Sequence, residues 1–122
     1  MITAQKTSVL VVDDDTILRE LLVKALTIKG YTVLDADNGS KALDILDRED
    51  VDVVVTDLQM PKMDGIELCQ RIKDHKIVPV ILCTAHREEF GDRKYPCIDK
   101  LISKPFRLEH VVEAIEDCLA MH

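Results

Sequence analysis

The feature that most constrains the fold is a regular alternation of two kinds of segment along the 122 residues. Short runs rich in valine and isoleucine alternate with longer segments in which apolar residues recur at helical spacing. This alternation predicts an α/β protein, with a doubly wound five-stranded parallel sheet and about five helices covering both of its faces. The expected strands are Ser8–Val12, Tyr31–Asp35, Val51–Thr56, Val78–Thr84 and Leu101–Ser103.

Helix boundaries follow from residues that favour helix ends. The first helix, Thr16–Lys29, should stop at Gly30, since glycine is common just after a helix. Asn38 and Asp64 are good first-turn caps for the second and third helices, and the last runs from Arg107 to about Met121. The apolar stripe of the first helix that should face the core is Ile17, Leu18, Leu21, Leu22, Ala25 and Ile28.

Composition limits the function classes. The length and the 47% apolar content suit one domain over residues 1–122. A formal charge of −7 argues against direct binding to nucleic acid. The four cysteines lack zinc-site spacing, so we expect reduced and mostly buried thiols. Neither a signal peptide nor a membrane-spanning apolar run is found, so we expect a cytoplasmic protein with no membrane contact.

Polar residues collect where the predicted strands end. Asp13 and Asp14 follow the first strand, Asp57 follows the third, Thr84 ends the fourth and Lys104 follows the fifth. The carboxyl ends of parallel strands lie at one edge of a sheet, and ligands bind at that edge. These five side chains are therefore expected to share one site.

The chemistry of these side chains favours phosphoryl transfer. Three neighbouring acids repel one another, and Mg²⁺, which leaves positions open for water or a phosphate oxygen, relieves that repulsion. Asp57 is the carboxylate best placed to act as nucleophile, while Lys104 and Thr84 could supply a cation and a hydrogen-bond donor. Asp15 is interpreted as a helix cap. The glycine motifs of nucleotide-binding loops and the G-x-S-x-G elbow are absent from the sequence.

Four motifs resemble, in order and approximate spacing, the receiver domain of two-component response regulators. They are VLVVDDD at Val9–Asp15, VTDLQMPKMDG at Val55–Gly65, PVILCTA at Pro79–Ala85 and SKPF at Ser103–Phe106. The resemblance covers nearly the whole chain. It implies a flavodoxin-like fold with strand order 2-1-3-4-5.

The resemblance also implies a reaction and a metal site. A histidine kinase or phosphotransfer protein would donate the phosphoryl group of a phosphohistidine to Asp57. Asp14 would bind Mg²⁺ directly and Asp13 through water, while Asp57 and the main-chain carbonyl of Gln59 would complete the protein ligands. An output protein or an effector domain, unknown from this sequence, would read the change, and a phosphorylation-dependent dimer is compatible with it.

Three more expectations concern the switch. Thr84 would turn toward the phosphoryl oxygens and Lys104 would pair with them, and the Lys104–Pro105 bond is typically cis in this family. Leu101 stands where many receivers have an aromatic residue, which excludes an aromatic rotamer change there. The Ala85–Asp99 crossover is expected to hold a short or irregular helix that responds to phosphorylation.

Two alternatives to a phosphorylation-controlled switch stay open. One is a protein-interaction module with this fold that works without phosphorylation. The other is a Mg²⁺-dependent phosphatase with Asp57 as nucleophile, which would be expected to carry a second acid where Gln59 stands. We expect a switch that turns over no external substrate, and so is not an enzyme in the usual sense.

Overall fold

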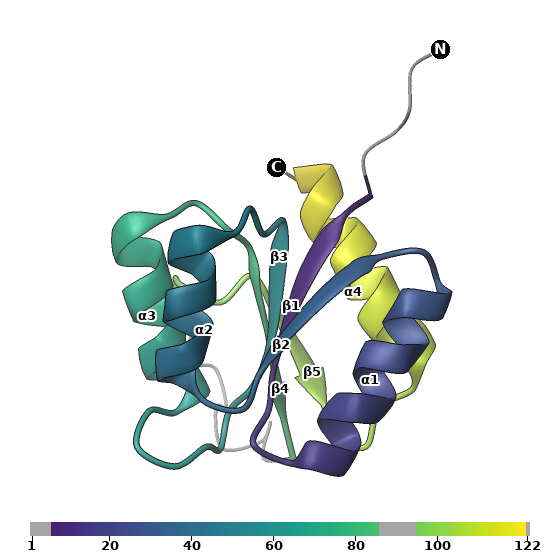
Figure 1. Ribbon diagram of the computed structural model, residues 1–122, viewed down its shortest axis with the longest axis horizontal. Helices are drawn as coiled ribbons and strands as arrows, with labels where there is room; N and C mark the ends of the chain where they lie inside the picture. Colours follow the sequence, from purple (N-terminus) through teal and green to yellow (C-terminus); the bar gives the residue numbers. More distant parts are fainter. Residues whose placement is uncertain (1–5, 86–94, 122) are drawn as a thin grey trace.

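The computed structural model describes residues 6–85 and 95–121 and shows one sheet between two layers of helices (Figure 1). The five strands are parallel and lie in the order β2-β1-β3-β4-β5, so the predicted flavodoxin-like order is confirmed. In chain order the elements are β1 (Ser8–Val12), α1 (Thr16–Ile28), β2 (Thr32–Ala36), α2 (Gly39–Arg48), β3 (Val53–Asp57), α3 (Gly65–His75), β4 (Val80–Thr84), β5 (Lys100–Ser103) and α4 (Leu108–Met121).

The helix count differs slightly from the expected five, because the described part of the chain holds four helices. A fifth helix was expected in the Ala85–Asp99 crossover. Residues 86–94 of that crossover lie outside the described residues. The end of the crossover is described, and there the Asp99 carboxylate accepts the Val80 amide hydrogen and pairs with Lys73 Nζ, each at 2.8 Å.

The strands build two cores because their successive side chains point to opposite faces. In β1, Val9 and Val11 lie in the core under α1 and α4, whereas Leu10 and Val12 lie in the core under α2 and α3. Figure 1 shows the same division, with α1 and α4 on one side of the sheet and α2 and α3 on the other. Both faces are covered, which is why the strands are almost continuously apolar.

The residues expected to cap helices do so. The Asp15 side chain accepts a hydrogen bond from the Leu18 amide, and Asn38 and Asp64 cap α2 and α3 in the same way. Gly30 follows α1 with a φ of 104°, a conformation that favours glycine. β1 has the predicted bounds, and the ends of the other strands differ from the prediction by at most two residues; β4, for example, begins after Pro79, which has no amide hydrogen to donate.

The predicted core stripe of α1 is partly wrong. Leu26 is fully buried, whereas Ile17, Leu21 and Ile28 are 73%, 60% and 84% exposed. Leu22 is partly buried and packs against the core cluster that contains Leu26. The apolar surface of α1 is therefore wider than its contact with the sheet, and its outer part faces solvent.

All four cysteines are free and buried, as expected. The Cys69 thiol donates to the Cys97 carbonyl over 2.7 Å, and burial, with that bond next, raises the pKa of the thiol. Among the described residues, none of the helices has both the length and the apolar character that a membrane crossing requires.

Candidate functional site

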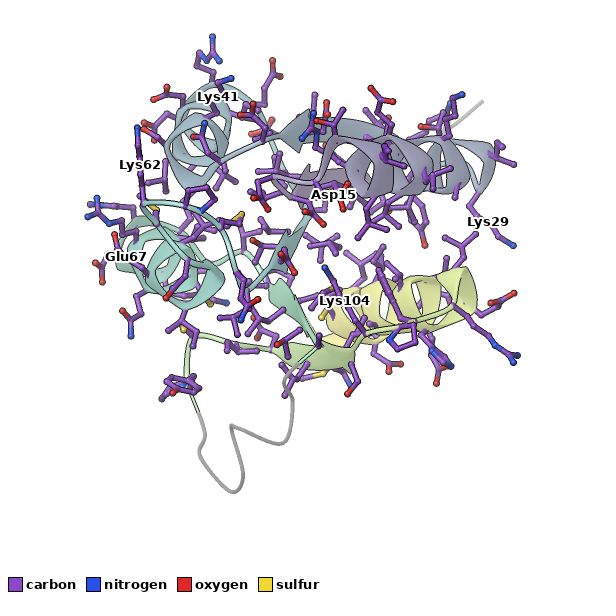
Figure 2. The ribbon with its side chains drawn as sticks, turned by 90° about the horizontal axis from the view of Figure 1, so that it is seen from below. Asp15, Lys29, Lys41, Lys62, Glu67 and Lys104 are labelled. Carbon is purple, nitrogen blue, oxygen red and sulfur yellow. The ribbon has the colours of Figure 1, made fainter. Side chains whose placement is uncertain are left out.

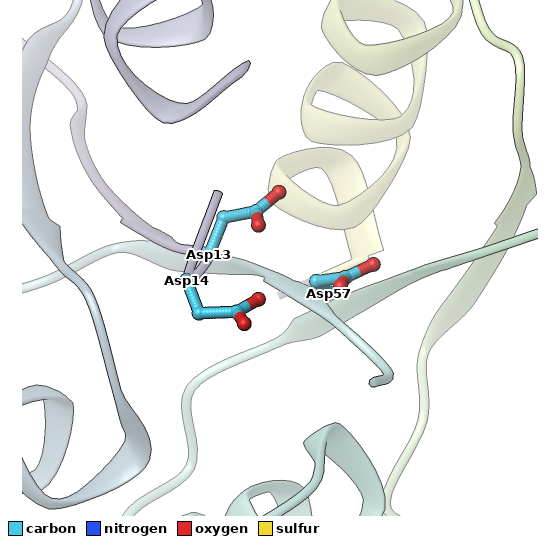
Figure 3. Close-up of side chains that lie close together, drawn as sticks. All are labelled: Asp13, Asp14 and Asp57. Atoms are coloured by element: carbon cyan, nitrogen blue, oxygen red, sulfur yellow. The ribbon is translucent and has the colours of Figure 1, made fainter. Parts of the chain in front are cut away.

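Three acids meet at the carboxyl edge of the sheet. β1 and β3 are neighbours, and Val12 is paired with Thr56, so Asp13 and Asp57 leave the two strands side by side. Asp14 follows on the same loop (Figure 3). One carboxylate oxygen from each acid lies within 4.8 Å of the others, so the predicted cluster is formed.

The main chain of Asp13 is tightly fixed. Its amide donates to the Ala36 carbonyl over 3.1 Å, and its own carbonyl accepts a hydrogen bond from Arg19 Nη1 over 2.7 Å. Its carboxylate accepts the Asp15 amide hydrogen over 2.9 Å. Arg19 was not among the predicted site residues.

Burial is the largest influence on the carboxyl of Asp13, a residue that is only 7% exposed. Burial raises its pKa, the Asp15 amide opposes the rise, and the negative charge of Asp57 adds to it. The pKa of Asp13 consequently lies above its ordinary value. Negative charge is thus concentrated at a site that is largely shielded from solvent.

Lys104 brings a positive charge to the acids from the end of β5. Its Nζ lies 2.7 Å from Asp57 Oδ1 and 3.9 Å from Asp13 Oδ2. Burial alone would lower the pKa of this ammonium, but the hydrogen bond and charge of Asp57 outweigh burial, so the pKa is raised. Figure 2 looks onto this edge and shows Lys104 there, together with the cap residue Asp15.

Thr84 ends β4 and is fully buried at 1% exposure. Its carbonyl accepts the Lys104 amide hydrogen over 2.8 Å, so the main chain joins these two predicted site residues. The Lys104–Pro105 bond is cis, as the resemblance implied. Leu101 lies on β5 and is half-buried.

The loop between β3 and α3 is closed by close backbone packing. The Gly65 amide donates to the Leu58 carbonyl over 2.8 Å, and Lys62 has a positive φ of 71°. A Cβ on Gly65 would lie 2.4 Å from the Asp57 carbonyl oxygen, so this position has no room for a side chain. Gln59 is exposed on the same loop, and the ligand role of its main-chain carbonyl stays a prediction.

The donor set suits a hard divalent cation. Three carboxylates face one ammonium, and carboxylate oxygens at this spacing could hold a metal ion together with water or other oxygen ligands. Since two of the acids are partly or fully buried, their mutual repulsion is poorly screened by solvent. A bound cation would remove that repulsion.

A family profile described as "Response regulator receiver domain" matches residues 9–116. The chain belongs to this receiver family. Over 118 residues it is 44% identical to the probable transcriptional regulator ycf27 of Porphyridium aerugineum, and over 113 residues it is 38% identical to the transcriptional regulatory protein GlrR of Escherichia coli K12. These matches cover 94% and 90% of this chain.

Solved receiver structures have the same fold. The response regulator TrrA of Thermotoga maritima, crystallised with Mg²⁺-BeF, is 32% identical with a TM-score of 0.84, and the match covers 93% of this chain and 99% of that one. The chemotaxis response regulator CheY4 of Vibrio cholerae is 26% identical with a TM-score of 0.84 and coverages of 94% and 100%. By contrast, this chain spans 49% of the ycf27 protein and 26% of GlrR.

Proposed function

We propose that this receiver domain is a phosphorylation-controlled switch, with Asp57 as the residue that accepts the phosphoryl group. The observation that carries the proposal is the position of the Asp57 carboxylate, 2.7 Å from Lys104 Nζ and within reach of the Asp13 and Asp14 oxygens. The donor would be a phosphohistidine on a histidine kinase or phosphotransfer protein. The readout would be a change in binding to an output partner or effector domain.

The phosphoryl transfer needs no reactant besides the phosphohistidine and Asp57. A carboxylate oxygen of Asp57 forms a bond to phosphorus as the phosphorus–nitrogen bond breaks, and the electron pair of that bond stays on the imidazole nitrogen. Because the donor ring carries a proton on its other nitrogen, the products are an acyl phosphate on Asp57 and a neutral histidine. Water later attacks the phosphorus, which releases inorganic phosphate and restores the carboxylate.

Asp13, Asp14, Asp57 and the main-chain carbonyl of Gln59 would hold Mg²⁺, with Asp13 acting through water. When bound, Mg²⁺ supplies positive charge that offsets the negative charge of the phosphoryl oxygens. TrrA, 32% identical to this chain, was crystallised with Mg²⁺-BeF, which supports a similar site here.

Lys104 would exchange partners during the reaction. Its ammonium now pairs with Asp57, which raises the pKa of Lys104, and it would pair with a phosphoryl oxygen after transfer. Thr84, which ends the neighbouring strand, would donate its hydroxyl hydrogen to a second phosphoryl oxygen. Both roles rest on the predicted chemistry and on the shared edge of the sheet.

The output is proposed from the relatives. The ycf27 and GlrR proteins are named transcriptional regulators and are longer than this chain, so a receiver that controls a separate output function fits them. The proposed switch turns over no substrate in solution, and these residues do not bind nucleic acid directly. A dimer that forms on phosphorylation is compatible with it.

Mass spectrometry of the intact protein tests the assignment of Asp57. With Mg²⁺ and a small phosphodonor, the unchanged chain and an Asp47→Asn control, altered at an exposed acid of α2, should each gain one phosphate. Asp57→Asn should gain none. Equal phosphorylation of Asp57→Asn would contradict the assignment, and no phosphorylation of the unchanged chain would favour an interaction module that works without phosphate.

A further inference from the structure

Arg19 connects the acid cluster at the end of β1 to the neighbouring edge strand, β2. It lies on the second turn of α1, and its side chain is 13% exposed. Nη1 donates to the Asp13 carbonyl over 2.7 Å, and Nε pairs with Asp35 Oδ2 on β2 over 2.9 Å. Neither contact belongs to the predicted phosphoryl or metal chemistry.

We infer that Arg19 is a positioning residue for the metal site, because it sets the direction of the peptide that joins Asp13 to Asp14. This inference rests on the proposed Mg²⁺-dependent function. The Asp13 carbonyl and the Asp14 amide belong to one planar peptide unit, so a bond that orients the carbonyl also orients the start of Asp14. The carboxylate of Asp14 is exposed, and its direction therefore depends strongly on its main chain.

The other bonds around Asp13 leave this peptide plane unfixed. The Ala36 carbonyl holds the amide on the other side of Asp13, and the Asp15 amide binds its carboxylate. Among residues 6–85 and 95–121, the hydrogen bond that the Asp13 carbonyl accepts comes from Arg19 Nη1. Groups that orient metal ligands without touching the metal commonly affect affinity by about tenfold or more.

The arginine fork suits this task. The guanidinium is planar and rigid, so the Asp35 ion pair at Nε fixes the plane in which Nη1 meets the Asp13 carbonyl. A lysine at this position would keep the charge but could not present two nitrogens in a fixed geometry. Charge and geometry can therefore be separated by substitution.

The two roles of Arg19 predict opposite effects on Mg²⁺ binding. If only its charge mattered, Arg19→Gln would remove a cation that repels Mg²⁺ and would tighten binding, while Arg19→Lys would leave binding unchanged. If Arg19 orients the Asp13 carbonyl, both substitutions should weaken binding. Whether Arg19→Gln binds Mg²⁺ more tightly or more weakly thus distinguishes a charge role from a positioning role.

The experiment is a titration with MgCl₂ followed by the amide resonances of the folded protein. Arg19→Lys and Arg19→Gln should each bind Mg²⁺ about tenfold more weakly than the unchanged chain. The matched control is Arg71→Gln, which removes an exposed cation paired with Glu67 on α3 and should change the affinity by less than about twofold. Raised Mg²⁺ should restore phosphorylation by a small phosphodonor in both Arg19 variants, which a general structural defect would not allow.

Each outcome separates this inference from the proposed function. If the unchanged chain does not bind Mg²⁺, the proposed function fails. If it binds Mg²⁺ and the Arg19 variants bind equally well or more tightly, the positioning role is overturned. Should both Arg19 variants fail to fold, Asp35→Asn tests the inference instead, because it weakens the contact that holds the guanidinium and keeps the charge of Arg19. Unchanged Mg²⁺ affinity in Asp35→Asn would overturn the inference.

Discussion

Gly65 matters to the site through the side chain that it lacks. Its Cα lies so close to the end of β3 that an added Cβ would meet the Asp57 carbonyl oxygen at 2.4 Å and Leu82 Cδ1 at 2.6 Å. The carbonyl belongs to the main chain and cannot move aside like the end of a flexible side chain. A larger residue here must displace Asp57 or the first turn of α3.

Gly65→Ala should lower the free energy of unfolding by about 1–3 kcal/mol, the usual cost of overpacking, and should also reduce phosphorylation of Asp57. Gly30→Ala is the matched control. Its φ of 104° makes alanine cost about 1–2 kcal/mol, but no atom lies within 4 Å of the new Cβ. Thermal melts and intact-mass phosphorylation should show both variants destabilised and only Gly65→Ala impaired in phosphorylation; full phosphorylation of Gly65→Ala would contradict the steric account.

Asp13→Asn should stabilise the metal-free protein. It removes one of three neighbouring negative charges, while the amide oxygen can still accept the Asp15 hydrogen bond and Lys104 keeps Asp57 as partner. The expected gain at neutral pH is on the order of 1 kcal/mol, or about 4 °C in Tm. Added Mg²⁺ should reverse the order, because the unchanged chain binds it better.

The pH dependence of that gain has a defined sign. Since the pKa of Asp13 is raised in the folded state, the ionised carboxylate is less favourable there than in the unfolded chain. The advantage of Asp13→Asn should be complete above the raised pKa and should disappear as the pH falls below the ordinary value for aspartate. An advantage that grows as the pH falls, measured by melts without Mg²⁺, would contradict this account.

At the scale of single elements, α1 shows what a local pattern can and cannot tell. Its start at Asp15 and its end near Gly30 were predictable, since capping depends on neighbouring residues in the sequence. Which apolar residues face the sheet was not, because that depends on the angle at which the helix packs. Leu26 is buried although it was outside the predicted stripe, and Leu21 is exposed although it was inside.

This difference gives a matched pair of substitutions on one helix. Leu26→Ala should lower the free energy of unfolding by about 2–5 kcal/mol, because it leaves a cavity in the core under α1 and α4. Leu21→Ala, at a side chain that is 60% exposed, should change it by less than about 0.5 kcal/mol. Chemical denaturation measures both, and similar losses in the two variants would contradict the described orientation of α1.

At the scale of the whole molecule, the sequence predicted which side chains meet at the sheet edge. It did not predict the contacts that hold those side chains in place. Asp13, Asp57 and Lys104 were predictable because the carboxyl ends of parallel strands must share an edge. The bonds of Arg19 to Asp13 and Asp35 were not, since they depend on how α1 packs across β1 and β2. The close approach at Gly65 is likewise a product of tertiary packing.

The central claim is that the acid cluster and Mg²⁺ together allow Asp57 to form an acyl phosphate. Phosphorus nuclear magnetic resonance of the chain, incubated with a small phosphodonor, measures this product directly. With Mg²⁺ present, the account predicts one acyl phosphate signal on the protein, which hydroxylamine removes and which is absent after a chelator has withdrawn the metal. A protein-bound phosphate signal of equal size without Mg²⁺, or one that resists hydroxylamine, would contradict the account.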